Sequence, residues 1–179
     1  MIFPQGFQTD RLLLRQPTMT DANLIFDLYA SDSEVTKYLN WRTHGSVVET
    51  EAYLQQTLEK NNDHRGQTYA IEFLNASTGL VGMIAMHHAQ KFEIRFGYVL
   101  ARDFWGRGVV SEVLRPLVTW ALRQEQVVRL SAICDAENLG SARVLQKSGF
   151  QQEALMRKSD ICPNLSSEPR DHFLFSLTR

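Results

Sequence analysis

The stretch that decides the fold is FWGRGVVSEVL, residues Phe104–Leu114, in which two glycines flank an arginine and an apolar run follows. The apolar spacing predicts a long helix over Val109–Gln124, although Pro116 inside it predicts a kink or a weaker helix. A helix N-terminus presents unpaired N–H groups and a partial positive charge, and phosphate groups bind there. Gly106 and Gly108 have no Cβ, so a ligand can approach these amides closely. The stretch therefore predicts a pyrophosphate site, or else two glycines that only shape a loop.

The composition is that of an ordinary globular chain, with 179 residues, 44% hydrophobic and 22% charged. This length suits one domain over residues 1–179. The 19 Lys and Arg against 20 Asp and Glu argue against a general nucleic-acid binder. The N-terminus has charges inside its apolar part, unlike a signal peptide, and no stretch approaches the ~20 apolar residues of a membrane span. From these two features we expect a cytoplasmic protein. Cys134 and Cys162 lie far apart and match no metal spacing, so we expect no metal.

The remaining patterns predict an alternation of strands and helices. Ser46 opens a Ser-x-x-Glu capping box with Glu49, and Asn75–Gly79 is a turn cluster. Strands are expected at 9–16, 68–74, 80–86, 92–100, 127–134, 150–158 and 172–178, and helices at 20–30, 33–39, 46–60, 109–124 and 138–148. This order predicts a mixed α/β or α+β domain.

One alternative for the glycine stretch is a nicotinamide dinucleotide site. Residues 106–111 read G-x-G-x-x-S, one residue short of the dinucleotide fingerprint, and a strand ending at Asp135 could supply a ribose-binding acid. Two features count against this interpretation: residues 101–105 separate the strand from the first glycine, and Ser111 replaces the third glycine. The Walker phosphate-binding pattern is absent from the sequence.

A second motif, NLGSARVLQKSGF over residues 138–150, points to another class of phosphate ligand. Together the two motifs resemble those of the GNAT N-acetyltransferases, in the branch similar to ribosomal-protein alanine N-acetyltransferases. That branch shows Asn-x-x-Ser-x-x-x-(Leu or Tyr)-x-Lys-x-Gly-Phe, and the matching residues here are Asn138, Ser141, Leu145, Lys147, Gly149 and Phe150. TDRLLLR at 9–15 and PNLSSEPRDHFLF at 163–175 also resemble segments of relatives, so the resemblance covers about residues 8–178.

The sequence departs from the family pattern at three positions. Trp105 stands where the general motif has Gln or Arg, and Val110 stands where it has Gly or Ala. Leu145 stands where some acetyltransferases carry a tyrosine that acts as general acid on the departing thiolate. This missing tyrosine keeps open a second alternative, a non-catalytic acyl-CoA sensor or interaction module.

The resemblance implies a mostly antiparallel, splayed sheet in which the strand 93–100 parts from the strand 127–135. The pantetheine arm of acetyl-CoA would lie in the gap, and the pyrophosphate would lie on the helix start. Asn138 would hold the pantetheine amide or cap its helix, and Ser141 would face the thioester or be an ordinary first-turn serine. The implied cofactor-binding residues are Tyr98, Val99, Leu100, Trp105, Gly106, Arg107, Gly108, Val109, Val110, Ser111, Asn138 and Ser141.

The implied reaction is direct attack of an amine on the acetyl thioester, with a protein N-terminus or a small-molecule amine as acceptor. An α-amine, with pKa ~8, needs a weaker base than a lysine, with pKa ~10.4. The oxyanion would be bound by the main-chain N–H of Val99 or Leu100, and Ser141 would steady the thiolate. Candidates for the base are Glu72, Glu93, Asp135 and His87, of which we name Glu93 as catalytic with Ser141.

Other residues are assigned to the acceptor side. Tyr38, Trp41 and Arg42 lie in the helical region that caps the acceptor site in this fold. Arg170-Asp171 is expected to form an ion pair in the last hairpin or to line the acceptor pocket. His87 and His88 face opposite sides of a strand, which argues against a metal site. We expect neither a nucleic-acid nor a membrane partner, and a homodimer stays open.

Overall fold

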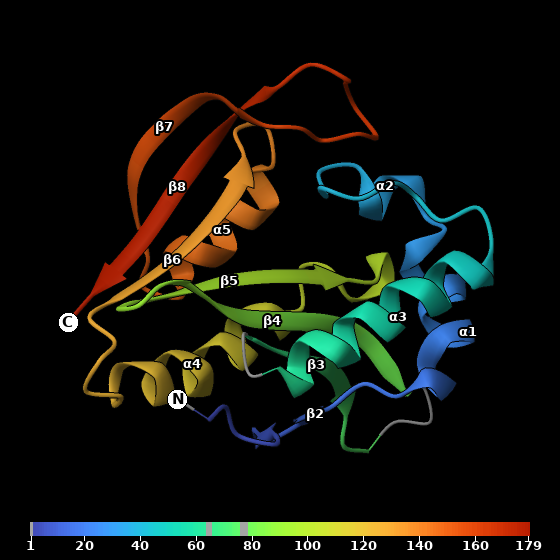
Figure 1. Cartoon of the computed structure of the whole chain (residues 1–179), viewed down its shortest axis with the longest axis horizontal. Coiled ribbons are helices and arrows are strands. Elements are labelled where there is room, and N and C mark those ends of the chain that lie inside the picture. The colour runs from blue at the N-terminus through green and yellow to red at the C-terminus, as the bar shows by residue number, and fades with distance from the viewer. Residues whose placement is uncertain (1, 64–65, 76–78) are drawn as a thin grey trace.

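All strands of the computed structural model belong to one eight-stranded sheet in the order β1-β2-β3-β4-β5-β6-β8-β7 (Figure 1). The structure describes residues 2–63, 66–75 and 79–179. The strands are β1 (Phe7–Gln8), β2 (Leu12–Arg15), β3 (Gly66–Phe73), β4 (Leu80–Gln90), β5 (Glu93–Leu100), β6 (Arg129–Asp135), β7 (Gln151–Asp160) and β8 (Arg170–Thr178). The helices are η1 (Met19–Asp21), α1 (Ala22–Ile25), η2 (Phe26–Ala30), α2 (Ser33–Thr36), α3 (Val47–Asn62), η3 (Arg102–Phe104), α4 (Val109–Leu122) and α5 (Leu139–Lys147).

The sheet is antiparallel except where β5 meets β6. These two strands pair in parallel over only four residues, Glu93–Phe96 against Arg129–Ala132. Beyond Phe96 they part, and β6 and β8 rise away from β5 in Figure 1. The expectation of a mixed, mostly antiparallel, splayed sheet flanked by helices is therefore confirmed, with the opening next to the start of α4.

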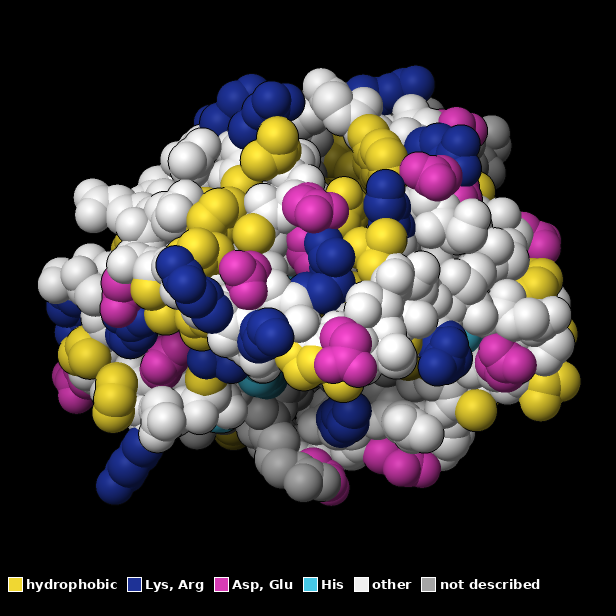
Figure 2. Space-filling view, turned by 90° about the horizontal axis from the view of Figure 1, so that it is seen from above, with side chains coloured by type: hydrophobic (Ala, Val, Ile, Leu, Met, Phe, Trp, Pro, Cys, Tyr) yellow, Lys and Arg dark blue, Asp and Glu magenta, His cyan; other side chains and the backbone are white. Residues whose placement is uncertain are grey.

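Two apolar clusters fill the two faces of the sheet. On one face, Val113 and Leu117 of α4 pack with Ile84 of β4. On the other face, Ile25 of α1 and Leu54 of α3 belong to a cluster that includes Met83 of β4, because neighbouring strand residues point to opposite faces. On the outer surface seen in Figure 2, basic and acidic side chains are intermingled, as the near-neutral charge suggests. In the part of the chain that the structure describes, no helix is long and apolar enough to cross a bilayer.

The N-terminal elements differ from the sequence-based expectations in detail. The strand expected over 9–16 is a hairpin of β1 and β2, closed by a hydrogen bond from Thr9 N–H to Leu12 C=O. The helix expected from Thr20 begins at Met19, where Thr18 and Asp21 form the capping box, and it becomes a π-helix from Phe26. These differences follow from local hydrogen bonds that periodicity does not report.

Two other local predictions have different outcomes. The helix after Ser46 is confirmed, but the Ser46 side chain makes no cap hydrogen bond. The Glu49 carboxylate instead accepts from the N–H of Gly45 at 3.0 Å. Pro116 lies inside α4, which continues to Leu122 because its buried face is held by tertiary packing. The turn predicted at 75–79 includes residues 76–78, which lie outside the described part of the chain.

Candidate active site

The gap between β5 and β6 exposes an edge of main-chain polar groups. Main-chain N–H and C=O groups alternate between the two sides of a strand. Because the N–H of Ala101 donates to Val81 C=O of β4 at 2.9 Å, the groups of Tyr98 and Leu100 point into the gap. The same alternation turns the groups of Val99 toward β4. This register does not fit our prediction that Val99 pairs with pantetheine or binds the oxyanion through its main chain.

Trp105 binds back onto the end of β5. Its indole Nε1–H donates to Leu100 C=O at 2.7 Å, while 48% of the residue stays exposed. The tryptophan thus fixes the short η3 segment against the open edge of β5. The N–H of Leu100 and both groups of Tyr98 remain directed into the gap.

The glycine turn has the backbone conformation that the sequence suggested. Gly106 and Gly108 have φ of +73° and +74°, the left-handed region in which a side chain is strained. A Cβ on Gly106 would meet no atom within 4 Å, so its conformation and an open approach explain the glycine better than packing does. The first hydrogen bond of α4 runs from Glu112 N–H to Gly108 C=O at 3.0 Å. The N–H groups of residues 109–111 therefore have no partner within the helix.

Arg11 braces this turn from the start of β2. Its Nη2 donates to Arg107 C=O at 2.8 Å, and its Nε donates to Glu112 at 2.7 Å. Thr9 Oγ1 also donates to Glu112 at 2.6 Å. Burial alone would raise the pKa of Glu112, but these hydrogen bonds outweigh it and lower the pKa. Sequence analysis read TDRLLLR as part of a strand and of a resemblance, and it missed this bracing role.

A hollow of about 710 Å³ opens beside the same turn. Ser111 and Arg115 of α4 line it, together with Lys147 from the end of α5. Lys147, which the sequence analysis matched to the second motif, thus contributes a positive charge next to the candidate pyrophosphate site. Arg107 itself is turned over the ring of Phe104, with 5.5 Å between the guanidinium carbon and the ring centroid.

The start of α5 faces Tyr98 across the gap. Asn138 caps the helix, because its Oδ1 accepts from Ser141 N–H at 3.0 Å. The Ser141 hydroxyl lies 2.7 Å from the Tyr98 hydroxyl. Leu145, by contrast, is fully buried in the apolar core. Burial raises the pKa of Tyr98, so its hydroxyl stays protonated at neutral pH. No pattern in the sequence indicates this pairing, because it depends on the distance between two separate elements.

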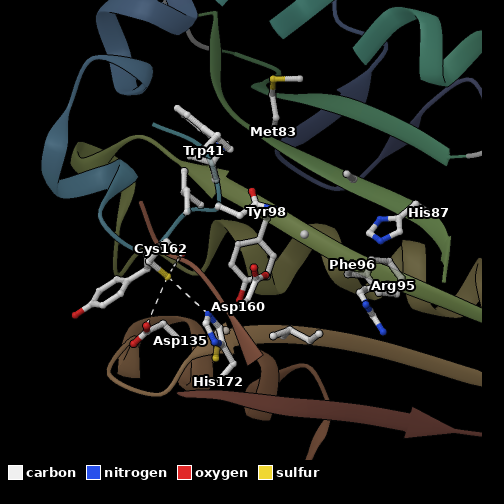
Figure 3. A pocket seen from close by; sticks show the side chains of 18 of the residues that line it. Trp41, Met83, His87, Arg95, Phe96, Tyr98, Asp135, Asp160, Cys162 and His172 are labelled. Atoms are coloured by element: carbon white, nitrogen blue, oxygen red, sulfur yellow. Dashed lines mark hydrogen bonds between the residues drawn. The ribbon is translucent and has the colours of Figure 1, made fainter. Parts of the chain in front are cut away.

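A cavity of about 410 Å³ lies at the gap (Figure 3). Its walls come from the segment after α2, from β4, β5 and β6, and from the β7–β8 hairpin; they include Tyr38, Trp41, His87, Arg95, Tyr98 and Asp160. Figure 3 shows His87 and Arg95 at one end and Asp135, Cys162 and His172 at the other. The structure therefore brings Tyr38 and Trp41 to the cavity, and Arg42 is not among the residues that line it.

The four candidate bases divide into two groups. Glu72 is bound by Arg15, which also holds Asp21. Glu93 accepts from the Ser131 hydroxyl at 2.5 Å where β5 and β6 still pair. Neither carboxylate is among the residues that line the cavity, whereas His87 and Asp135 both line it. Asp160, which sequence analysis did not consider, also lines the cavity.

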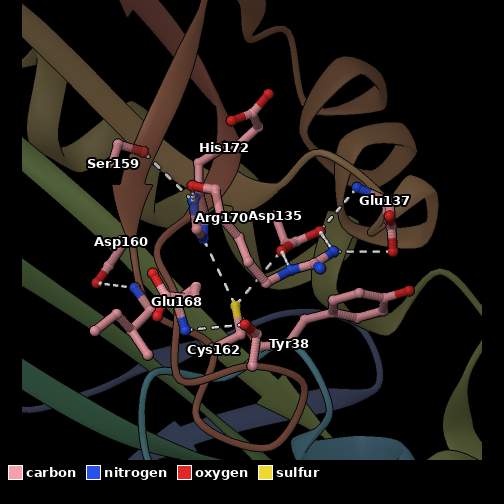
Figure 4. Close-up of polar contacts among 12 residues, drawn as sticks. Tyr38, Asp135, Glu137, Ser159, Asp160, Cys162, Glu168, Arg170 and His172 are labelled. Carbon is pink, nitrogen blue, oxygen red and sulfur yellow. Dashed lines mark hydrogen bonds and ion pairs between the residues drawn. The ribbon is translucent and has the colours of Figure 1, made fainter.

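Asp135 is the centre of a buried polar cluster (Figure 4). Arg170 Nε lies 2.6 Å from its carboxylate, and Arg170 Nη2 lies 2.9 Å from Glu137. Burial raises the pKa of Asp135, but the hydrogen bonds from Arg170 and the Glu137 N–H outweigh it, so the pKa is lowered. Asp171 instead accepts from Lys158 N–H at 2.9 Å. The predicted Arg170–Asp171 ion pair is therefore wrong, because neighbouring strand residues point to opposite faces.

Cys162 and His172 complete this cluster. Cys162 Sγ lies 3.6 Å from Asp135 and 3.7 Å from His172 Nε2. The three side chains could each offer one ligand atom to a metal, and these atoms lie within 4.8 Å of one another. Arg170 already neutralises the Asp135 carboxylate, and its positive charge would repel a metal ion. The cluster is therefore best described as a hydrogen-bonded wall of the cavity.

Comparison with known proteins gives one consistent result. A family model described as an acetyltransferase (GNAT) domain matches residues 11–151. An uncharacterized N-acetyltransferase of Bacillus subtilis, YoaA, is 33% identical over 153 residues, which cover 84% of this chain and 85% of the relative. The protein p20 of Bacillus licheniformis, also described as an uncharacterized N-acetyltransferase, is 27% identical and is matched over 96% of this chain and 94% of its own.

Solved structures share the fold. MccE, a microcin C7 self-immunity acetyltransferase solved with acetyl-CoA and AMP, has a TM-score of 0.85 and 20% identity, and the match covers 99% of this chain and 98% of MccE. RimL, a ribosomal L7/L12 alpha-N-protein acetyltransferase solved with coenzyme A, has a TM-score of 0.82 and 20% identity, with 99% and 98% of the two chains covered. At this identity the two structures support the fold alone.

Proposed function

The chain belongs to the GNAT acetyltransferase family, and from that premise we propose that it acetylates a primary amine by direct attack on acetyl-CoA. As a family member it is an acetyl-CoA-dependent acyltransferase, which replaces the interpretations as a sensor module and as a nicotinamide enzyme. The acceptor, the mechanism and the residue roles below are our proposals.

The observation that carries the proposal is the position of the β5–β6 gap next to the glycine turn. The pyrophosphate is bound by the N–H groups that begin α4, and Arg115 and Lys147 supply positive charge nearby. The pantetheine arm pairs with the gap-facing N–H and C=O of Tyr98 and behaves like an added strand. Asn138 can donate from its amide NH₂, because its Oδ1 is already used as the helix cap.

Two hydroxyls serve the leaving thiolate. The Ser141 hydroxyl donates toward the sulfur, and the Tyr98 hydroxyl donates to Ser141 Oγ across 2.7 Å. Because Ser141 Oγ accepts this hydrogen bond, the Ser141 hydroxyl hydrogen is not used toward Tyr98 and can point into the gap. Tyr98 thereby orients the donor and partly replaces the tyrosine that is absent at Leu145.

The developing oxyanion is bound by the main-chain N–H of Leu100, which the strand register directs into the gap. We assign the base role to Asp160 rather than to Glu93. Asp160 lines the cavity and accepts from its neighbour's N–H at 2.8 Å, while Asp135 is committed to Arg170 and Glu93 to Ser131. A carboxylate acting through water suffices for an α-amine, whose pKa is ~8.

The acceptor class that fits best is an α-amine, on a protein N-terminus or on a small molecule. RimL is named for a ribosomal protein and MccE for microcin C7, which supports both kinds of acceptor. A homodimer and a cytoplasmic location stay predictions.

The test is an acetylation screen with the purified protein, in which free thiol release and the mass of the product are both measured. We expect thiol release that depends on an added α-amine and a product heavier by one acetyl group. The variant Asp160→Asn should lower kcat with α-amines and shift the pH profile. The variant Glu93→Gln should leave both kcat and the pH profile unchanged. Acetyl-CoA turnover that is independent of every amine would contradict the proposal.

A further inference from the structure

We infer that the acceptor is a primary amine that also carries an anionic group, a carboxylate or a phosphate, which Arg95 binds inside the cavity. This inference rests on the proposed function, since it assigns the substrate class of the same site. It starts from a guanidinium that lines the cavity with weak partners of its own.

Arg95 has donor groups left for a ligand. Its Nε donates to the neutral Ser131 hydroxyl at 3.3 Å, and its Nη2 lies 3.6 Å from Glu93, beyond ordinary hydrogen-bond length. Its side chain is 36% exposed, and His87 stands directly opposite it in the β4–β5 register. A guanidinium offers paired donors that match carboxylate and phosphate oxygens.

The nearest carboxylate compensates Arg95 only in part. Glu93 is 7% exposed, accepts from Ser131 at 2.5 Å and lies 3.6 Å from Arg129 as well. Arg129 in turn is 2.7 Å from Glu153 on β7. Glu93 thus divides its charge between two arginines and does not line the cavity, so the cavity wall at this end presents positive charge.

The other end of the cavity has the opposite character. Asp135 is neutralised by Arg170, but Asp160 has a backbone N–H as its described hydrogen-bond partner. An acceptor with a cationic amine and an anion at its two ends complements this layout. Because a charge withdrawn from water is costly without a partner, the substrate anion stabilises the complex through Arg95.

The strand geometry sets the direction of the acceptor. The Leu100 N–H, which binds the oxyanion in the proposed mechanism, lies five residues from Arg95 on the same strand. The long arginine side chain spans part of this separation, so the acceptor extends along β5 from the reacting amine toward the Arg95 guanidinium. An N-terminal amine with an acidic second side chain and a short aminoalkyl phosphate are two acceptors of this form.

The test compares matched acceptors with and without the anionic group. Glycyl-glutamate amide is compared with glycyl-glutamine amide, and 3-aminopropyl phosphate with 3-aminopropanol. We expect the anionic member of at least one pair to have a kcat/KM about 10- to 100-fold higher, the range of a charge-assisted hydrogen bond. The pair that responds distinguishes a carboxylate acceptor from a phosphate acceptor.

The variant Arg95→Gln should remove this preference, and Arg95→Lys should retain part of it, while the KM for acetyl-CoA is unchanged. Arg123→Gln is the matched control, because it removes an exposed positive charge that does not line the cavity and forms no described ion pair with Glu93, and it should keep the preference. Melting temperatures confirm that each variant is folded. Equal kcat/KM within both pairs, or a preference that survives in Arg95→Gln, overturns the inference while amine acetylation stands. Absence of coenzyme A binding in calorimetry overturns the proposed function itself, and the inference with it.

Discussion

In the proposed site, Tyr98 contributes both through its main-chain groups and through its hydroxyl. Its main-chain groups face the gap, and its hydroxyl lies 2.7 Å from that of Ser141 on α5. A hydroxyl that fixes another hydroxyl acts on catalysis and adds little to ground-state binding.

We therefore predict that Tyr98→Phe lowers kcat about tenfold or more with the KM for acetyl-CoA nearly unchanged. Steady-state kinetics check this, with Ser141→Ala beside it. Because the two residues act as one unit, the double variant should be scarcely worse than Ser141→Ala alone. Additive losses in the double variant would show that the hydroxyls act independently.

The Asp135–Arg170 pair yields a prediction on stability. The Asp135 side chain is fully buried and its pKa is lowered, so its contribution is present above the unfolded-state pKa of ~3.9 and lost as pH falls below it. Asp135→Asn should lower the free energy of unfolding by about 2 kcal/mol at pH 7, with the difference shrinking below about pH 4. Urea unfolding of the wild type and the variant at pH 7 and below about pH 4 measures this difference in free energy. Glu125→Gln, an exposed control, should change stability by less than about 0.5 kcal/mol.

At the scale of elements, the start of α4 joins core packing to the proposed pyrophosphate site. Val109 and Val110 bury their side chains in the core while their N–H groups have no partner within the helix. Arg11 and Glu112 hold the preceding turn in place. A rigid turn keeps the N–H groups converged before any ligand arrives, so less ordering is required on binding.

We predict that Gly108→Ala weakens coenzyme A binding at least tenfold, because a methyl group then stands at the approach to the α4 amides. Gly149→Ala is the control, since Gly149 also has positive φ, at +91°, but follows the far end of α5. Both variants should lose about 1 kcal/mol of stability from the left-handed conformation. Calorimetric titration with coenzyme A separates them; equal losses of affinity would remove the assignment of the pyrophosphate site.

At the scale of the whole molecule, the site exists because the sheet opens. β5 and β6 pair over four residues and then part, and the cavity lies where they separate. A ligand that adds hydrogen bonds along the open edge bridges the two parts of the sheet.

We expect acetyl-CoA to raise the melting temperature accordingly. At about 100 times its Kd it adds about 2.7 kcal/mol to stability, which corresponds to roughly 5–10 °C for a chain of this length. Thermal unfolding with acetyl-CoA and with NAD at equal concentration measures the difference. A similar rise with NAD would contradict selective binding of coenzyme A.

The sequence by itself determined most elements and the conformation of the glycine turn. Apolar periodicity placed most helices and strands within a few residues, and Gly106 and Gly108 marked the turn before α4, because steric limits on φ are local. Asn138 was placed at its helix cap because an asparagine side chain that accepts from first-turn N–H groups is likewise a local signal.

Only the tertiary structure decided what meets across the gap. In the folded chain Tyr98 contacts Ser141, and Arg170 forms its ion pair with Asp135 rather than with Asp171. Glu93 is buried against Ser131 within the sheet, whereas Asp160 lines the cavity. These contacts join residues far apart in the chain, and their partners depend on strand register. A shift of register by one residue would turn each side chain to the other face, which the composition of a single strand does not reveal.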